Sequence, residues 1–253
     1  MAHSTRKILI TGGAKRVGAG LTRAAAADGW EVLIHCHQNR QAAEALAAEL
    51  QQDGATASVL QADLADEAAC RQLMQSAFET GPLDALINNA SLFRYDDTAA
   101  FKSEDIAAHM AVNLAAPARL TADMAAALKG RHHGVVINML DAKLFGLNPD
   151  YFTYTLSKAA LKTMTEMMAQ AFAPHLRINA IAPGITLPSG GQSQAEFEEA
   201  HKRNPLGKGA EIAEIVAAMR LLLNATSMTG HHIVLDGGAH LCPEARDVAF
   251  LKD

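Results

Sequence analysis

The chain has 253 residues, of which 49% are hydrophobic, and a formal net charge of −5. This composition fits a globular enzyme, and the lack of a basic excess argues against a nucleic-acid partner. No apolar run is long enough to span a bilayer, so we expect no membrane partner; the three cysteines form no CxxC pair, which favours a reduced, cytoplasmic setting over a disulfide framework.

In chain order, short apolar runs alternate with longer amphipathic stretches. We predict strands over residues 7–10, 31–36, 57–60, 83–87, 134–139, 177–181 and 232–235. Helices are predicted over residues 17–29, 40–53, 67–80, 103–130, 154–172 and 212–223. This alternation predicts a single α/β domain over residues 1–253, a Rossmann-like, doubly wound parallel sheet with helices on both faces. In such a fold, ligands bind at the carboxyl edge of the sheet.

The segment over residues 185–209 breaks this rhythm. It contains Pro188, Gly190, Gly191, Pro205 and Gly207, so we expect an irregular stretch. A long irregular segment inside a compact domain is often a lid, and here it would cover the substrate. A surface loop without a role is the alternative.

A glycine-rich turn, Thr11-Gly12-Gly13-Ala14-Lys15-Arg16-Val17-Gly18, follows the first predicted strand and opens a helix. Glycines there allow a tight turn and a close backbone approach to a pyrophosphate, and the helix N-terminus then faces the phosphate with free N–H groups. A glycine cluster alone is a weak signal, and a plain strand-to-helix turn is the alternative. The position of the glycine-rich turn between a strand and a helix favours a dinucleotide site.

The second predicted strand ends about 20 residues past the glycines, where a dinucleotide fold contacts the ribose. An NAD site would place Asp or Glu there, whereas this tip offers His35, His37, Asn39 and Arg40. These groups would attract a 2′-phosphate, so the sequence favours NADPH over an ordinary polar turn. Asp63, after the third strand, is expected to cap a turn and touch the adenine edge.

Tyr154 and Lys158 are four residues apart, which places them on one face of a helix. A free tyrosine is a poor acid–base group at neutral pH, and we expect the neighbouring ammonium to lower its pKa. The pair can then donate a proton to a developing anion as hydride arrives. Alone, such a pair is common on surface helices. Its position after a phosphate loop and after the fifth predicted strand favours a catalytic role.

Together these elements resemble the short-chain dehydrogenase/reductase family over nearly the full chain. The resemblance rests on the Thr11-Gly12 loop, Asp63-Leu64, Asn88-Asn89-Ala90, Asn113, Tyr154-x-x-x-Lys158, Pro183-Gly184 and Asp236-Gly237-Gly238. It implies hydride transfer at C4 of a nicotinamide and a homotetramer. It also implies that Lys158 holds the nicotinamide ribose, that Asn113 supports a proton-relay water, and that Pro183 and Gly184 border the nicotinamide.

Two positions depart from the general family pattern. Arg16 stands at the middle glycine of the family's TGxxxGxG loop, and Asp141 stands where the family usually has serine, thirteen residues before Tyr154. A carboxylate would meet the alkoxide-like transition state of ketone reduction with the wrong charge, so ketone reduction is disfavoured unless Asp141 is protonated. For a substrate with ring N–H donors, such as a pterin, an Asp beside a Tyr can orient the phenol and pass on a proton.

Both departures resemble the pteridine reductase branch of the family and the related dihydromonapterin reductases. The matching segments are Thr11 to Gly18, His35-x-His37, Asn89-Ala90-Ser91-x-Phe93 and Met139-x-Asp141-Ala142. The resemblance implies NADPH-dependent reduction of dihydromonapterin, dihydrobiopterin or dihydrofolate to the tetrahydro form. It further implies that Phe93 stacks on the pterin and sandwiches it against the nicotinamide, while Ser91 and Arg16 bridge the cofactor phosphate and the pterin.

The expected catalytic residues are Asp141, Tyr154, Lys158 and Asn113, and the expected substrate residues are Arg16, Ser91, Phe93, Asp141 and Tyr154. The expected cofactor-binding residues are Gly12, Lys15, Arg16, Val17, His35, His37, Asn39, Arg40, Asp63, Leu64, Asn89, Ala90, Ser91, Met139, Tyr154, Lys158, Pro183 and Gly184. The histidines show no ligand spacing, so no metal is predicted.

Two other functions remain open. One is a general carbonyl or 3-oxoacyl-thioester reductase, against which Asp141 and Arg16 both argue. The other is a non-catalytic NADP(H)-binding regulator, which would need none of Asn113, Tyr154 and Lys158. The tail over residues 241–253 is a candidate to reach the site of a neighbouring subunit.

Overall fold

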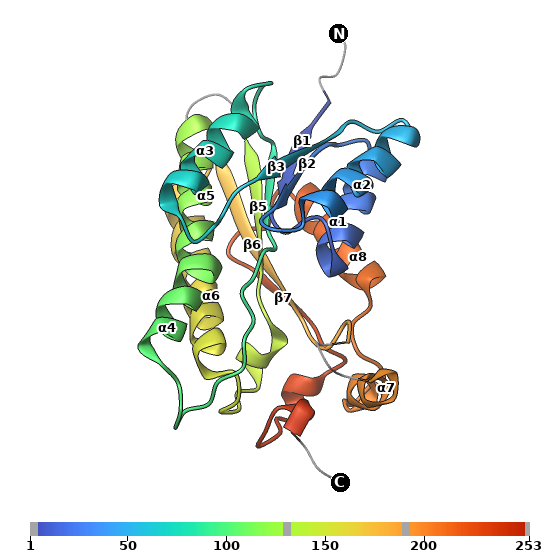
Figure 1. Ribbon diagram of the computed structural model, residues 1–253, viewed down its shortest axis with the longest axis vertical. Coiled ribbons are helices and arrows are strands. Elements are labelled where there is room, and N and C mark those ends of the chain that lie inside the picture. Colours follow the sequence, from blue (N-terminus) through green and yellow to red (C-terminus); the bar gives the residue numbers. More distant parts are fainter. Residues whose placement is uncertain (1–4, 129–132, 189–192, 251–253) are drawn as a thin grey trace.

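The chain is built around one seven-stranded sheet, described in a computed structural model for residues 5–128, 133–188 and 193–250 (Figure 1). All its strand pairs are parallel, in the order β3-β2-β1-β4-β5-β6-β7. The strands are β1 (Lys7–Ile10), β2 (Glu31–Cys36), β3 (Ala57–Gln61), β4 (Ala85–Asn88), β5 (Gly134–Met139), β6 (Leu176–Pro183) and β7 (His232–Leu235). The predicted α/β fold with a doubly wound parallel sheet is confirmed.

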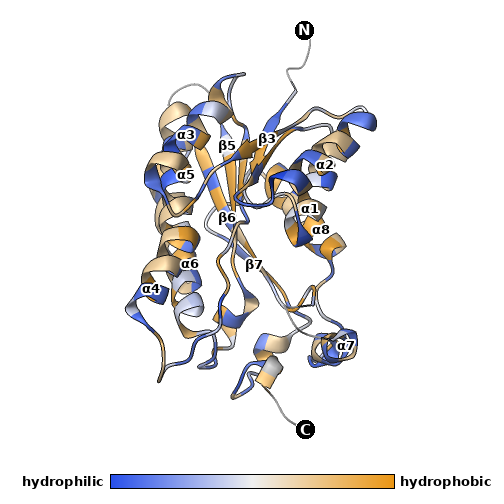
Figure 2. Cartoon of the chain, viewed as in Figure 1, coloured by the Kyte–Doolittle hydropathy of each residue, from blue (hydrophilic) through white to orange (hydrophobic). Residues whose placement is uncertain are grey.

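Helices cover both faces of this sheet (Figure 1). One face carries α1 (Arg16–Ala27), α2 (Arg40–Gln52) and α8 (Ile212–Asn224), and the other carries α3 (Glu67–Phe78), α5 (Ala116–Leu128) and α6 (Phe152–Phe172). Along β1, Ile8 and Ile10 pack toward the first group of helices and Leu9 toward the second, as the alternation of a strand requires. Figure 2 shows the resulting apolar strands between the two helical layers.

The helix predicted over residues 103–130 is interrupted, so this prediction was wrong in its middle. The chain forms α4 (Ser103–Met110), a π-helical turn (Ala111–Ala115) and then α5, while residues 129–130 lie outside the described part. Pro117 has no amide N–H to donate to the carbonyl of Asn113, so the α-helical bonding pattern cannot continue there. The wider turn carries the buried Asn113.

The segment over residues 185–209, predicted to be irregular, contains the helix α7 (Gln194–Lys202). Ser193 caps it: the Ser193 hydroxyl accepts from the Glu196 amide at 3.3 Å, and the Glu196 carboxylate accepts from the Ser193 amide at 2.7 Å. This Ser-x-x-Glu capping box is a sequence signal for a helix start that the prediction overlooked. Residues 189–192 of the expected lid lie outside the described part of the chain.

After β7, two short 3₁₀ turns (Ala239–Leu241 and Val248–Phe250) carry the chain back toward the carboxyl edge of the sheet (Figure 1). This edge is also where the loops after β1 and β4 diverge, because the strand order reverses between those two strands. Within the described residues, no helix has both the length and the apolar character needed to cross a membrane.

Candidate active site

A cleft of about 1400 Å³ opens at this edge of the sheet. Its walls are the loops after β1, β2, β4, β5 and β6, together with α7 and residues that follow β7. Arg16, Asp141 and Tyr154, on which the predicted chemistry depends, all line it. Two of the predicted site residues, Arg40 and Asn113, are not among the described residues that line the cleft.

The turn between β1 and α1 is shaped by bare backbone. Gly12 has a φ of 62°, and a Cβ on Gly18 would lie 2.1 Å from the carbonyl oxygen of Gly12, so both positions require glycine. The Asn89 side chain braces the turn by donating to the carbonyls of Thr11 (2.9 Å) and Gly12 (3.1 Å). Because the Lys15 side chain does not cap α1, the first amide groups of this helix are open to an anionic group such as a diphosphate.

His35 supports this turn from below. Its ring is 1% exposed, accepts from the Gly12 amide at 3.1 Å through Nδ1, and places Nε2 3.2 Å from the Ala62 carbonyl oxygen. Burial lowers the pKa of His35 to about 4, so the ring is neutral at physiological pH. The structure therefore contradicts the predicted electrostatic attraction of His35 for a 2′-phosphate, because the last residues of β2 are buried in the sheet.

The end of the cleft expected to take the ribose is lined by Lys15, His37, Asn39 and Asp63. Lys15 Nζ donates to Asn39 Oδ1 at 2.6 Å, and the His37 ring lies 3.6 Å from the Asp63 carboxylate. Arg40, another of the predicted cofactor-binding residues, is exposed and donates to Glu44, one turn along α2. Of the two cations predicted at this end, Lys15 lines the cleft and Arg40 does not.

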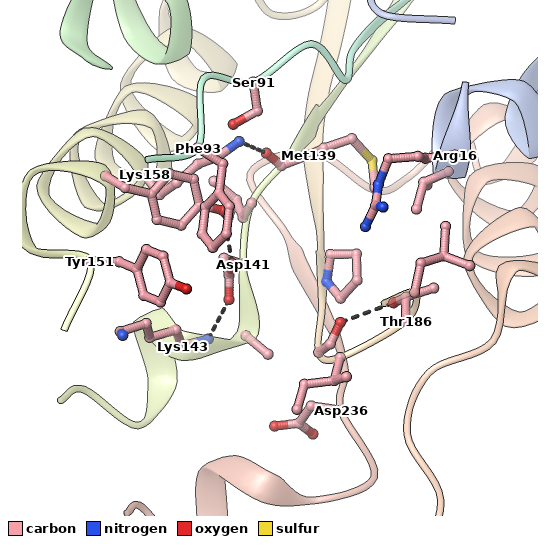
Figure 3. A pocket seen from close by; sticks show the side chains of 18 of the residues that line it. Arg16, Ser91, Phe93, Met139, Asp141, Lys143, Tyr151, Lys158, Thr186 and Asp236 are labelled. Atoms are coloured by element: carbon pink, nitrogen blue, oxygen red, sulfur yellow. Dashed lines mark hydrogen bonds between the residues drawn. The ribbon is translucent and has the colours of Figure 1, made fainter. Parts of the chain in front are cut away.

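Arg16 adopts an unusual backbone conformation. Its φ is 54°, and this left-handed region costs a residue with a Cβ about 1–2 kcal/mol. Its guanidinium donates to the Pro188 carbonyl at 2.8 Å. Figure 3 shows the side chain reaching into the cleft from the side opposite Phe93 and Asp141. Strain kept at a residue of this kind is a reason to look for a ligand that the residue contacts.

Tyr154 and Asp141 form the centre of the opposite wall. The Tyr154 hydroxyl donates to Asp141 Oδ2 at 2.8 Å, and Asp141 Oδ1 accepts from the Lys143 amide at 2.9 Å. Burial, followed by the negative charge of Asp141, raises the pKa of Tyr154 well above its ordinary value. The net shift is therefore upward, opposite to the lowering that was expected. The phenol therefore stays protonated at neutral pH and holds a proton that could pass to a developing anion.

Lys158 lies one turn further along α6. It is 2% exposed, its Nζ donates to the Met139 carbonyl at 2.7 Å, and Nζ lies 5.8 Å from the centre of the Tyr154 ring. Burial lowers the pKa of Lys158 to about 8, although Asp141 opposes the shift. The ammonium therefore lies beside the Tyr154 ring, where its charge favours the phenolate over the phenol.

Phe93 presents an apolar surface beside these groups. Its ring is 48% exposed, stacks on Tyr151 with centroids 4.5 Å apart, and meets the Tyr154 ring edge-on at 4.7 Å. Sequence reasoning found Phe93 and missed Tyr151, which also lines the cleft and has a φ of 52°. The arrangement offers an aromatic support on which a flat ring can stack.

Comparison with known proteins places this geometry in a family. A family model described as short chain dehydrogenase matches residues 6–199. The chain belongs to the short-chain dehydrogenase/reductase family. A solved structure titled FolM alternative dihydrofolate reductase 1 from Brucella canis, complexed with NADP, is 41% identical, with 96% of each chain covered and a TM-score of 0.90.

The relatives of this chain are named for different activities. A dihydromonapterin reductase from Enterobacter sp. is 31% identical over 93% of this chain and 97% of the relative. A 3-oxoacyl-[acyl-carrier-protein] reductase from Synechocystis sp. is 27% identical over 94% of this chain and 98% of the relative. Family membership alone therefore leaves the substrate open, and the side chains in the cleft must decide it.

Asn113 was expected to be catalytic. In the structure its side chain is hydrogen-bonded to two neighbouring segments. Its Oδ1 accepts from the Leu92 amide at 2.7 Å and from the Ser91 hydroxyl at 3.2 Å, and its Nδ2 donates to the Ser157 hydroxyl at 3.0 Å. These bonds tie the loop after β4 to α6, so Asn113 positions Ser91. The expected relay through a water at Asn113 stays a prediction.

At the end of β6, Pro183 and Gly184 line the cleft as expected for the border of a nicotinamide. The Gly184 amide donates to the Leu235 carbonyl at 2.7 Å, and a Cβ on Gly184 would lie 2.9 Å from the Asp236 Cβ, so β6 and the turn after β7 approach as closely as glycine permits. Among the described residues, no cluster of His, Cys, Asp or Glu side chains could hold a metal ion.

Proposed function

We propose that this protein uses NADPH to reduce the C=N bond of a dihydropterin to its tetrahydro form. The candidate substrates are dihydromonapterin, dihydrobiopterin and dihydrofolate. The observation that carries the proposal is the Asp141 carboxylate, 2.8 Å from the Tyr154 hydroxyl, in a cleft that Arg16 and Phe93 also line.

The cofactor end of the cleft supports NADPH. The glycine-lined turn and the uncapped start of α1 suit a diphosphate, and the Lys15 ammonium suits a 2′-phosphate. The NADP complex of the 41% identical structure is in line with this choice. When bound, NADPH supplies the hydride.

Reduction of a C=N bond adds that hydride to carbon and one proton to nitrogen. Tyr154 is protonated at neutral pH and is the proposed donor of the proton, and Lys158 stabilises the phenolate that remains until solvent reprotonates it. The Asp141 carboxylate accepts hydrogen bonds from the N–H groups of a pterin. The same negative charge would oppose the oxyanion that forms when a ketone is reduced.

The shape and charge of the opposite walls favour a flat heterocycle. The half-exposed ring of Phe93, backed by Tyr151, is the proposed stacking surface, and Arg16 is proposed to contact both the cofactor phosphate and the pterin ring. The names of two relatives, a dihydromonapterin reductase and an alternative dihydrofolate reductase, agree with this substrate class.

The test is a substrate panel with purified protein and NADPH, followed by the loss of NADPH absorbance. We expect turnover of at least one dihydropterin or of dihydrofolate, and no turnover with the control variant Tyr154→Phe. Turnover of an acetoacetyl thioester alone would favour the carbonyl reductase. Tight NADPH binding without turnover of any substrate would favour a regulator. Either result would overturn the proposal.

A further inference from the structure

Residues that follow β7 in the chain line the same side of the cleft as Tyr151 and Asp141. Residues 243–250, here called the tail segment, contribute lining side chains that include Arg246, Asp247 and Phe250. The tail was expected to be a candidate for reaching a neighbouring subunit, yet as far as Phe250 it lies against its own chain. Three separate contacts hold the tail segment there.

The first contact is a bidentate ion pair between the Arg246 guanidinium and the Asp150 carboxylate, here called the Arg246 fork. Arg246 Nε and Nη2 donate to the two oxygens of Asp150 at 2.8 and 2.6 Å, and the Asp247 amide donates to the same carboxylate at 2.7 Å. With the tail segment in place the Asp150 side chain is 1% exposed, so its negative charge is balanced by these donors and not by solvent. A buried carboxylate depends on such partners, and a bidentate guanidinium also fixes its direction.

The second contact leads to the catalytic carboxyl. Lys143 Nζ lies 3.3 Å from Asp247 Oδ2, and the backbone amide of the same lysine donates to Asp141 Oδ1 at 2.9 Å. Because Asp141 Oδ2 accepts from the Tyr154 hydroxyl, one residue, Lys143, separates the tail segment from the Asp141–Tyr154 pair.

The third contact is aromatic. The Phe250 ring packs on Tyr95 at 4.8 Å and lies 6.1 Å from Tyr151, which also meets Tyr95 edge-on at 5.2 Å and stacks on Phe93. Tyr151 directly follows Asp150 and has a φ of 52°, which a residue with a large side chain rarely adopts. Such a conformation persists only where the surroundings enforce it, and the Arg246 fork holds the adjacent residue.

We propose that Arg246 is a positioning residue for the substrate: by holding Asp150, it keeps Tyr151 in the conformation that supports Phe93 as a stacking surface. This inference rests on the proposed function for its kinetic readout. Arg246 acts through Asp150 and Tyr151, so its loss should weaken substrate binding more than proton transfer.

The experiment compares Arg246→Ala with Arg220→Ala in the full chain. Arg220 makes a similar fork to Asp28, at 2.7 and 2.8 Å, but joins α8 to the end of α1 away from the cleft, so it is a matched control. We expect Arg246→Ala to raise KM for dihydrobiopterin about tenfold, with kcat changed less than about threefold and NADPH affinity unchanged. Arg220→Ala should leave all three values as in the unaltered protein.

Two further variants address loss of folding. Arg246→Lys keeps the charge and loses the fork, so it should show a smaller rise in KM of the same kind. Combining Asp150→Asn with Arg246→Ala should raise KM no further than Arg246→Ala alone, because both changes break one interaction.

Hydrogen exchange provides a readout that needs no turnover. Amides of residues 150–157 should exchange at least about tenfold faster in Arg246→Ala than in Arg220→Ala, while those of β1 and β4 stay protected. Unchanged exchange with unchanged KM would overturn the inference, and so would faster exchange throughout the sheet in both Arg246 variants. If the unaltered protein reduces no dihydropterin but the local exchange still rises, the proposed function fails and the positioning by Arg246 stands.

Discussion

The two ends of the cleft are built in different ways. The cofactor end consists of short turns that follow neighbouring strands, and its key features are backbone features such as the φ of 62° at Gly12 and the uncapped start of α1. The substrate end is assembled from side chains that are distant in sequence, such as Asp150 and Arg246, 96 residues apart. Backbone groups suit an invariant ligand group such as a diphosphate. Side chains from distant segments can be replaced during evolution as the substrate changes.

A change at Asp141 should impair substrate turnover the most while leaving cofactor binding unaffected. Asp141→Ser should lower dihydropterin turnover about 100-fold, because it removes the carboxylate that orients the phenol and accepts N–H groups. The pKa of Tyr154 should fall, since Asp141 is one of the causes that raise it. Steady-state kinetics on a dihydropterin and on an acetoacetyl thioester measure the effect.

For Asp141→Ser, NADPH affinity serves as the internal control and should stay within about twofold, because no cofactor contact is lost. We expect thioester reduction to become measurable as dihydropterin reduction declines. Equal loss of NADPH affinity and turnover would show that Asp141 acts on the fold instead of the substrate.

Lys15 and Arg40 provide the corresponding test of the cofactor end. Lys15→Ala should raise KM for NADPH about tenfold, because the ammonium that lines the cleft is lost, and should leave KM for NADH unchanged. Arg40→Ala, the matched variant, should change KM for NADPH about twofold at most, since Arg40 does not line the cleft. The opposite ranking would show that Arg40, also predicted from the sequence, contacts the 2′-phosphate in place of Lys15.

The difference between the two ends also explains what the sequence could predict. Gly12 and the pair Tyr154 and Lys158 lie in short motifs whose spacing determines their geometry, so their place in the cleft followed from local rules. The roles of His35 and Tyr151 depend on burial and on a backbone conformation that only the folded chain imposes. No local pattern marks the Arg246 fork, because its partner lies in a different segment.

Arg16 links the two ends, and its replacement by the family's usual glycine separates stability from binding. Arg16→Gly should relieve the left-handed strain at φ 54° and stabilise the fold by about 1 kcal/mol, after allowing for the greater freedom of glycine in the unfolded chain. The same change should raise KM for a dihydropterin about fivefold, because a charge-assisted contact is lost. Urea denaturation and steady-state kinetics give the two values.

A matched change at Lys15, Lys15→Gly, has no positive φ to relieve, so the added freedom of glycine in the unfolded chain should leave it no more stable than the unaltered protein. If Arg16→Gly lowered stability as well, the strain argument for a ligand-binding role at Arg16 would lose its basis.

The smallest expected effect is a decline in kcat/KM at mildly alkaline pH. Burial lowers the pKa of Lys158 to about 8, whereas the pKa of Tyr154 is well above its ordinary value, so Lys158 is the group of this pair that titrates in this range. Loss of its charge removes the stabilisation of the phenolate left after proton transfer, and kcat/KM should fall about twofold between pH 7 and pH 8. A pH profile of kcat/KM at saturating NADPH measures this alkaline decline, here called the alkaline limb.

Stability should move the other way over the next interval of pH. Because the pKa of Lys158 is lower in the folded than in the unfolded chain, the unfolded state binds more protons between about pH 8 and pH 10, and the contribution of this group to the free energy of unfolding rises with pH. Falling activity without a parallel loss of stability therefore distinguishes titration of Lys158 from unfolding. Lys158→Arg, whose guanidinium keeps its charge, should lower the rate and remove the alkaline limb. If kcat/KM of that variant still declined at the same pH, the decline would have to be assigned to another titrating group.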